Sequence, residues 1–147
     1  MKTETLQQLV HGIIHEGKQI PESGDGVIAT AKRIGRLTHN GTLDFGGSEY
    51  SQAGVEWIEP EKKNEDDDYG WWMLDEGDYL VEYNESVTPT SDLRCFIQIW
   101  EPAARNGLSQ PFQIIKEARE PLTATIHVAD SGIGIKENAR ISFIGVM

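Results

Sequence analysis

Residues 99–108, IWEPAARNGL, bring together the side-chain types in this sequence that are best suited to binding and chemistry. Pro102 cannot donate to a β-ladder, so a strand that reaches Trp100 must end there. The two alanines that follow favour a short helical turn, which Gly107 would end in a left-handed conformation. The segment therefore predicts a turn that presents polar groups from the end of a strand.

Arg105 is the cation of this turn. We expect it near the amide-rich start of the short helix, where a phosphate or an oxyanion would find both a guanidinium and backbone N–H groups. The alternative is a surface arginine in a loop. The turn is thus either a working active site or a turn that keeps the shape of one without its chemistry.

Two histidines, His11 and His15, are spaced i, i+4 in a segment with helical periodicity, which would let them clamp a transition metal. Glu16 follows them instead of standing between them, so the pattern is not the H-E-x-x-H of zinc proteases. No third ligand stands out in the sequence. We therefore assign no metal ligand, and we expect His39 and His127 to be ordinary surface or core side chains.

Trp71 and Trp72, next to Tyr69, form an aromatic group that suits the stacking of a base. Successive side chains of a strand point to opposite faces of the sheet. One of the two tryptophans is therefore expected in the core, which leaves the other free to contact a ligand.

Charged residues gather in two further segments. Lys32, Arg33 and Arg36 form a basic cluster, but strand alternation would place Lys32 and Arg33 on different faces, so we expect a solvated edge strand. Residues 59–70, EPEKKNEDDDYG, are predicted to be a solvated acidic loop. Metal binding by its three consecutive aspartates is a weak alternative, because the alternating ligands of an EF-hand are missing.

The chain has 147 residues, a net charge of −11 at neutral pH and one cysteine. The length fits one domain over residues 1–147. The negative field disfavours nucleic acid as a partner, although a local cluster of cations can still hold a small phosphate ligand. No apolar run is long enough to cross a bilayer and no secretory signal is evident, so we expect a cytoplasmic protein. Cys95, between apolar neighbours, is expected to be buried.

Helical periodicity is confined to the N-terminal segment, where apolar residues at i, i+3, i+4 and i+7 spacing predict a helix over about 4–16. Short β-rich runs follow, separated by turn signals such as HNG, DEG and DSG. The fold class we expect is mainly β, a jelly-roll-like sandwich or barrel with one N-terminal helix. Strands are predicted at 26–34, 42–46, 53–59, 71–74, 78–84, 93–100, 111–116, 122–130 and 139–146.

From about residue 58 to the end, the order and spacing of these segments resemble the dCTP deaminase branch of the trimeric dUTPase superfamily. The best local match is LDEGDYLVEYNESVTPTSDL (74–93), which is similar to the family run L-x-P-G-E-F-x-L-x-x-T-x-E-x-V-x-L-P-x-D-L. AARNGL (103–108) stands where the family has L-A-R-x-G-L, and IKENARISFIGV (135–146) where it has L-x-x-G-M-R-I-x-Q-L. Residues 21–50 correspond to no family segment.

The resemblance implies a distorted, dUTPase-like jelly-roll β-barrel that forms a homotrimer, with nucleotide-sized clefts between subunits. It also implies a deoxynucleoside triphosphate as the ligand, accompanied by Mg²⁺ when it is bound. On the aligned turn, the implied nucleotide-binding residues are Trp100, Arg105, Asn106 and Gly107.

The departures from the family pattern G-R-S-S-x-A-R-x-G-L fall on its chemical groups. The phosphate-binding arginine aligns with Trp100, the two serines with Glu101 and Pro102, and the general-base glutamate of the deaminases with Thr125. Threonine cannot relay a proton at neutral pH as a carboxylate does. Glu101, Glu117 and Glu120 are the candidate replacement carboxylates, although Glu101 would repel a triphosphate unless Mg²⁺ bridges the two.

Three hypotheses follow. A rearranged dUTP hydrolase or dCTP deaminase would use Arg105 for phosphate and one of these carboxylates to activate water. A non-catalytic member of the fold, which we favour because several catalytic groups are missing together, would hold a ligand or partner in the old cleft. An unrelated β-sandwich module would bind a ligand such as a carbohydrate through Trp71, Trp72 and Trp100.

Overall fold

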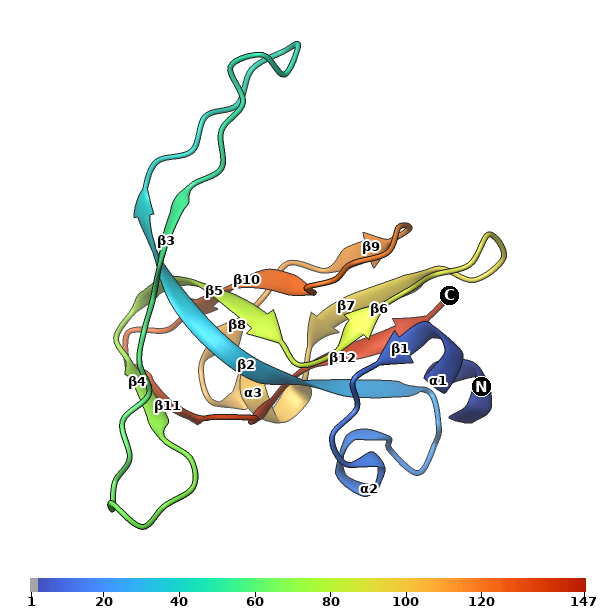
Figure 1. The fold of residues 1–147 in the computed structure, drawn as a ribbon, viewed down its shortest axis with the longest axis horizontal. Coiled ribbons are helices and arrows are strands. Elements are labelled where there is room, and N and C mark those ends of the chain that lie inside the picture. Colours follow the sequence, from blue (N-terminus) through green and yellow to red (C-terminus); the bar gives the residue numbers. More distant parts are fainter. Residues whose placement is uncertain (1–2) are drawn as a thin grey trace.

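A computed structural model describes residues 3–147 as a mainly β structure with three short helices among these residues (Figure 1). The helices are α1 (Thr3–Leu9), α2 (Glu16–Gln19) and α3 (Glu101–Arg105). The strands are β1 (Val10–His11), β2 (Gly26–His39), β3 (Gly54–Trp57), β4 (Trp71–Leu74), β5 (Gly77–Tyr83), β6 (Ser86–Val87), β7 (Cys95–Ile99), β8 (Leu108–Ser109), β9 (Gln113–Ile115), β10 (Thr123–Val128), β11 (Ile133–Lys136) and β12 (Arg140–Val146).

The main sheet is antiparallel and curled, in the order β8-β10-β5-β2-β12-β7-β9, with β3 added to the outer part of β2. Two smaller pairs, β4 with β11 and β1 with β6, close its ends. The long strand β2 crosses the whole body and continues with β3 into an arm that projects from it (Figure 1). The predicted mainly β fold class is confirmed.

Alternating burial along the strands builds the core. In β10, for example, Ala124, Ile126 and Val128 point inward while the residues between them point outward. Cys95 is fully buried in this core, as predicted, and burial raises the pKa of its thiol. The largest buried side chain is that of Trp72, whose indole Nε1 donates to the carbonyl of Ile58 at 2.8 Å.

The N-terminal helix is shorter than the predicted 4–16, because α1 ends at Leu9. Val10 and His11 pair with β6 instead, and Gly12 has a φ of 87°, a left-handed conformation that cannot continue a helix. The apolar periodicity is thus divided between elements: Leu9 and Val10 are both buried, whereas Ile14, predicted on the same helical face, is 55% exposed.

Several strand predictions also differ from the structure, since β2 runs to His39 and not to 34, and the short strands β1, β6 and β8 were not predicted. Residues 42–46 form no strand and keep a single bridge, from Thr42 to Ser51, because they form the tip of the arm. Strand β11 was not predicted, since its sequence IGIK carries a glycine and a lysine among few apolar residues. Hydrogen bonding to β4 stabilises this strand, although its local sequence has little β-propensity.

A buried carboxylate, Glu85, ties the N-terminal segment to the sheet. Its Oε1 accepts from the backbone N–H of Thr30 at 2.8 Å, and its Oε2 accepts from the Thr30 hydroxyl at 2.7 Å and from Gln19 Nε2 at 2.8 Å. Burial raises the pKa of Glu85, and these hydrogen bonds oppose the rise. The network holds α2 against the start of β2.

We expect Glu85→Ala to lower the free energy of unfolding by about 3 kcal/mol, because three buried donors lose their acceptor and a cavity is left. Chemical denaturation followed by circular dichroism measures the change. Glu76→Ala, at an exposed position one strand away, is the matched control and should shift the free energy by no more than about 0.5 kcal/mol. Equal losses in both variants would contradict a structural role for Glu85.

We expect the buried hydroxyl of Tyr83 to titrate at unusually high pH. Its hydroxyl is buried between Ser142 Oγ, at 2.7 Å, and Gln110 Nε2, at 3.2 Å, and burial raises its pKa from 10.0 to about 12. The raised pKa means that the folded state favours the neutral hydroxyl. The stability that this hydroxyl contributes is complete below pH 10.0 and should be lost as the pH rises through about 12. Ultraviolet absorbance should show a tyrosinate component near that pH that disappears in Tyr83→Phe and persists in Tyr50→Phe, whose ring is exposed.

Candidate functional site

The turn after β7 has the predicted form. Trp100 is the extended N-cap residue of α3, with φ −78° and ψ 139°, and Pro102 occupies the first turn, where its missing N–H costs no hydrogen bond. Gly107 ends the turn at φ 91°. Asn106 Nδ2 donates to the Pro102 carbonyl at 2.8 Å, which fixes the end of the turn.

Arg105 lies in the last turn of α3 and not near its amide-rich start, so that prediction is wrong. The helix begins at Glu101, two residues before the alanines from which the prediction placed it. Arg105 Nη2 pairs with Glu101 Oε1 at 2.6 Å, and both side chains are more than 70% exposed (77% and 72%). These two sequence-predicted residues therefore pair with each other at the surface.

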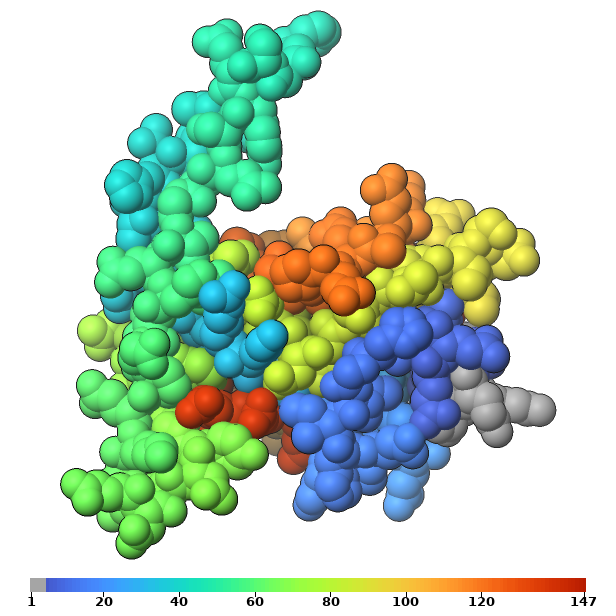
Figure 2. Space-filling model, viewed as in Figure 1, coloured from blue at the N-terminus to red at the C-terminus, as the bar shows by residue number. Residues whose placement is uncertain are grey.

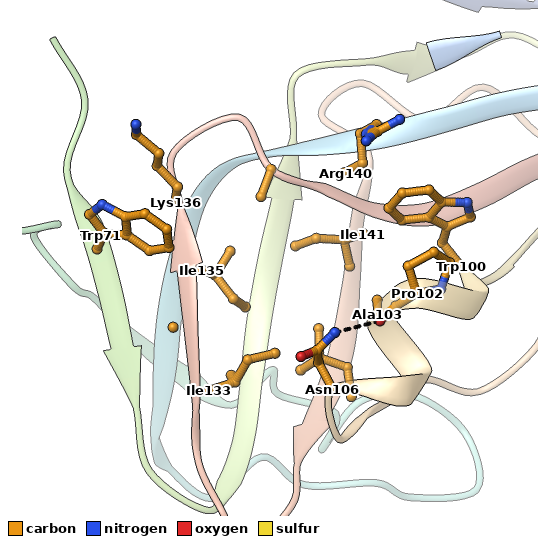
Figure 3. Close-up of a pocket in the computed structure, with 13 residues that line it drawn as sticks. Trp71, Trp100, Pro102, Ala103, Asn106, Ile133, Ile135, Lys136, Arg140 and Ile141 are labelled. Carbon is orange, nitrogen blue, oxygen red and sulfur yellow. Dashed lines mark hydrogen bonds between the residues drawn. The ribbon is translucent and has the colours of Figure 1, made fainter. Parts of the chain in front are cut away.

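A cavity of about 290 Å³ opens between Trp71 and Trp100 (Figure 3). The register of β4 and β11 places Trp71 opposite Lys136 on one side, and α3 places Trp100 and Asn106 on the other. The floor between them is apolar and consists of Ile133, Ile135 and Ile141.

Cations lie over both tryptophan rings of this cavity. The guanidinium carbon of Arg140 is 4.6 Å from the ring centroid of Trp100, while Lys63 Nζ and Lys136 Nζ are 4.0 Å and 5.7 Å from that of Trp71. Among the described side chains, no carboxylate forms an ion pair with Arg140 or Lys136. The rim is therefore cationic in a chain whose net charge is −11.

A second cavity, of about 500 Å³, lies on the other side of the Trp100–Arg140 pair. It shares Trp100, Ala139 and Arg140 with the first cavity, and Lys18 and Asn138 line its far side. Arg140 Nη1 donates to the Lys18 carbonyl at 3.0 Å, which holds the guanidinium between the two spaces. We call the two cavities together the tryptophan groove.

The structure brings some sequence-predicted residues into the tryptophan groove and leaves others outside it. Trp100 and Asn106 line it, whereas Glu101, Arg105 and Gly107 of the same turn do not. Glu117 is exposed in the segment after β9, also outside the groove. The arrangement thus separates these two candidate carboxylates from the cavity.

Trp71 faces the groove while Trp72 is buried, which confirms that one tryptophan of the pair belongs to the core. A ligand face made of Trp71, Trp72 and Trp100 is therefore wrong. Sequence reasoning missed Lys136 and Arg140. Arg140 does stand at the arginine of the family run L-x-x-G-M-R-I that IKENARI resembles, but that alignment does not show that its guanidinium lies over Trp100.

The basic cluster differs from its prediction in two ways. Strand β2 is central, between β5 and β12, and not an edge strand. A register shift between Ala31 and Arg33 breaks the alternation, so Lys32 Nζ and Arg33 Nη2 both reach Glu82, at 3.8 Å and 3.0 Å. Arg33 also stacks over Trp57, 3.6 Å from the ring centroid.

The histidine pair does not keep its predicted helical spacing, because α1 ends before His11. His15 caps α2 instead, its Nδ1 accepting from the Lys18 N–H at 3.2 Å. Within residues 3–147, no group of three His, Cys, Asp or Glu side chains is arranged to hold a metal ion. No helix in this range is long and apolar enough to cross a membrane.

A second group of chemically active side chains lies on the outer face of β10. His127 Nδ1 and Asp78 Oδ1 are 2.9 Å apart, and Ser109 stands opposite His127 in the register of β8 and β10. With Thr125 they line a cavity of about 440 Å³. The sequence offered no partner for His127, because Asp78 lies 49 residues away along the chain.

No known protein family's sequence pattern matches this chain. No characterised protein matches it by sequence either. Among solved structures, it resembles a 2′-deoxycytidine 5′-triphosphate deaminase from Agrobacterium tumefaciens, with a TM-score of 0.69 and 11% identity over 99% of the chain. The match spans 45% of the length of that deaminase chain. The likeness shows that this chain has the dUTPase-like fold.

Proposed function

We propose that this chain is a divergent dUTPase/dCTP deaminase-like protein that binds a nucleotide-sized anion in the tryptophan groove without the family's catalytic groups. The observation that carries the proposal is Arg140, stacked on Trp100 between two cavities and paired with no described carboxylate. Trp100 holds the position at which the resemblance expects a phosphate-binding arginine. Arg140 supplies a cation at that place from a neighbouring strand.

The dimensions of the groove suit such a ligand. Cavities that bind small molecules are mostly about 300–1,000 Å³, and the two parts of the groove measure about 290 Å³ and 500 Å³. The apolar first part would take a base beside Trp71 or Trp100, since aromatic stacking stabilises a bound base by roughly 1–3 kcal/mol. Arg140 and Lys136 would then face the phosphates, which they bind by charge-assisted hydrogen bonds.

No carboxylate lines the groove among the described residues, and the histidine that does, His15, uses its Nδ1 to cap α2. This lining favours binding over catalysis. Activating water for hydrolysis or deamination requires a group that accepts a proton near neutral pH. Glu101 is occupied by Arg105, and Glu117 lies outside the groove. These two glutamates stay candidate catalytic residues only for a ligand bound elsewhere.

The remaining features of the proposal come from the family resemblance. A homotrimer would place further clefts between subunits, in addition to the groove that one chain forms by itself. Mg²⁺ would accompany the phosphates of a bound triphosphate. In the cytoplasm, the protein would encounter the free deoxynucleoside triphosphates of the cell.

A second candidate function, a dUTP hydrolase or dCTP deaminase with a rearranged site, is favoured by the His127–Asp78 pair. An imidazole oriented by a carboxylate is a common general base. This pair lines a cavity of about 440 Å³ together with Thr125, the residue aligned with the general base of the deaminases. The pair could therefore take over that role for a ligand in this second cavity.

Nucleotide binding in the tryptophan groove should raise the thermal stability of the protein. Deoxynucleoside triphosphate with Mg²⁺, at about 100 times its dissociation constant, should stabilise the wild type by about 2.7 kcal/mol, or roughly 5–10 °C in melting temperature. Arg140→Gln should abolish the shift because it removes the cation between the two cavities. Arg105→Gln is the matched control and should keep the shift, since Arg105 pairs with Glu101.

Two outcomes of this melting experiment would contradict the proposal. No shift with any of the deoxynucleoside triphosphates, dUTP included, would exclude the nucleotide as the ligand of the groove. A shift that survives Arg140→Gln and disappears in Arg105→Gln would place the phosphates at the turn, as the sequence alignment has it.

A groove that binds without catalysing a reaction should leave nucleotides chemically intact. Incubation of the wild type with dATP, dCTP, dGTP, dTTP or dUTP and Mg²⁺, with products separated by anion-exchange chromatography, should leave every substrate unchanged. Conversion of dUTP to dUMP, or of dCTP to dUTP or dUMP, would support the second candidate function. In that case His127→Asn should abolish turnover if the His127–Asp78 pair is the base, whereas Glu117→Gln should abolish it if the predicted carboxylate is.

A further inference from the structure

The arm formed by the ends of β2 and β3 carries at its tip three large apolar side chains that are each more than half exposed. Figures 1 and 2 show the arm projecting well beyond the body of the molecule. The exposed fractions of Leu43, Phe45 and Tyr50 are 89%, 108% and 54%. Large apolar side chains this exposed in one short segment are typical of an interaction surface.

The tip is held in shape by its own polar contacts. Asp44 Oδ2 accepts from the backbone N–H groups of Gly47 and Glu49, at 3.0 Å and 2.9 Å. The hydroxyls of Thr42 and Ser51 are 2.9 Å apart across the base of the tip, and their backbones form a bridge. Because the loop is already ordered, docking would not have to restrict it first, which lowers the entropic cost of binding.

A second exposed apolar surface lies on the outer face of β7, β9 and β12. The Phe96 ring stacks on Phe112 at a centroid distance of 5.4 Å and lies 6.0 Å from Phe143. The rings sit over Gly145, where an added Cβ would come within 2.3 Å of Phe96. Phe112 and Ile114 remain 55% and 39% exposed. We call these four residues, Phe96, Phe112, Ile114 and Phe143, the aromatic face.

Charges at the two surfaces are complementary. Arg94 and Lys116 continue the alternation of Phe96 and Ile114, and the pairing of Cys95 with Ile115 places them side by side at one end of the aromatic face. Both are exposed. The tip of the arm carries an exposed carboxylate, Glu49, beside its apolar residues. In a chain with 24 acidic and 13 basic residues, a basic edge beside an aromatic surface matches an acidic, apolar partner such as this tip.

The tip of the arm and the aromatic face do not meet within one chain, since the tip stands clear of β7, β9 and β12 (Figure 1). We propose that the arm tip of one copy, through Leu43, Phe45 and Tyr50, docks on the aromatic face of a second copy. Two different surfaces of one chain make a head-to-tail contact, which closes into a ring or extends as a filament. This contact is independent of ligand binding in the tryptophan groove.

Size-exclusion chromatography with light scattering, over a concentration series, tests the contact. The wild type should have a mass of more than one chain. Leu43→Ser/Phe45→Ser, which removes the tip, and Phe112→Asp, which charges the aromatic face, should each reduce it to the mass of a single chain. Met73→Ser is the matched control, because Met73 is 69% exposed on β4, away from both surfaces, and should keep the wild-type mass.

Mixing the two defective variants distinguishes a head-to-tail contact from a symmetric one. The tip variant keeps an intact aromatic face and the Phe112→Asp variant keeps an intact tip, so together they should form a complex of two chains and no larger species. Circular dichroism of each variant confirms folding. A charge exchange gives an independent check: Glu49→Lys and Lys116→Glu should each weaken assembly, and mixing them should restore it.

The proposal is overturned if the wild type keeps the mass of one chain at every concentration, or if both defective variants assemble like the wild type. It is also overturned if the mixed variants fail to associate while the wild type assembles. The tip would be assigned to a lipid surface instead if the wild type stays a single chain and sediments with phosphatidylcholine vesicles, while Phe45→Ser does not sediment with them.

Discussion

The continuous hydrogen bonding of β2 is the constraint on which the body, the tryptophan groove and the arm all depend. This one strand of 14 residues pairs with β12 along its first half and with β5 and β3 along its second. Register shifts occur opposite Arg140 and again at Arg33, so the strand changes direction without losing its partners. Between these shifts, Thr30 binds the buried carboxylate of Glu85. The curl of the sheet and the projection of the arm are consequences of the same strand.

Electrostatics explains why a chain with a charge of −11 can present a cationic groove. Cations that lie among carboxylates are neutralised locally, as Arg33 is by Glu82 and Arg105 is by Glu101. Arg140 and Lys136 instead lie over tryptophan rings, whose faces attract a cation without cancelling its charge. An anion in the groove therefore meets cations whose charge has not been neutralised, although the molecule as a whole repels it at long range.

Local patterns in the sequence predicted what depends on neighbouring residues. The alternation around Trp71 and Trp72, the burial of Cys95 and the left-handed Gly107 are of this kind, and each is confirmed. What the sequence could not predict depends on residues distant in the chain: the partner of His127, and the Arg140 cation above Trp100. Apolar periodicity also predicted one long helix in the N-terminal segment, where the structure has α1 followed by β1. There, successive apolar residues pack against different elements.

The departures of the turn from the family pattern that it resembles do not decide by themselves whether this chain binds an anion there. Strands β7 and β12 are hydrogen-bonded neighbours, and the Trp100 N–H donates to the Ile141 carbonyl at 3.0 Å. Side chains at the end of β7 and the start of β12 therefore face the same space, so either strand can place a cation beside this cavity. Trp100 with Arg140 has this form: the tryptophan provides the stacking surface and the adjacent strand provides the charge. The turn lacks the arginine of the pattern it resembles, whereas Arg140, aligned with the arginine of the separate G-M-R-I run, lies beside the same cavity.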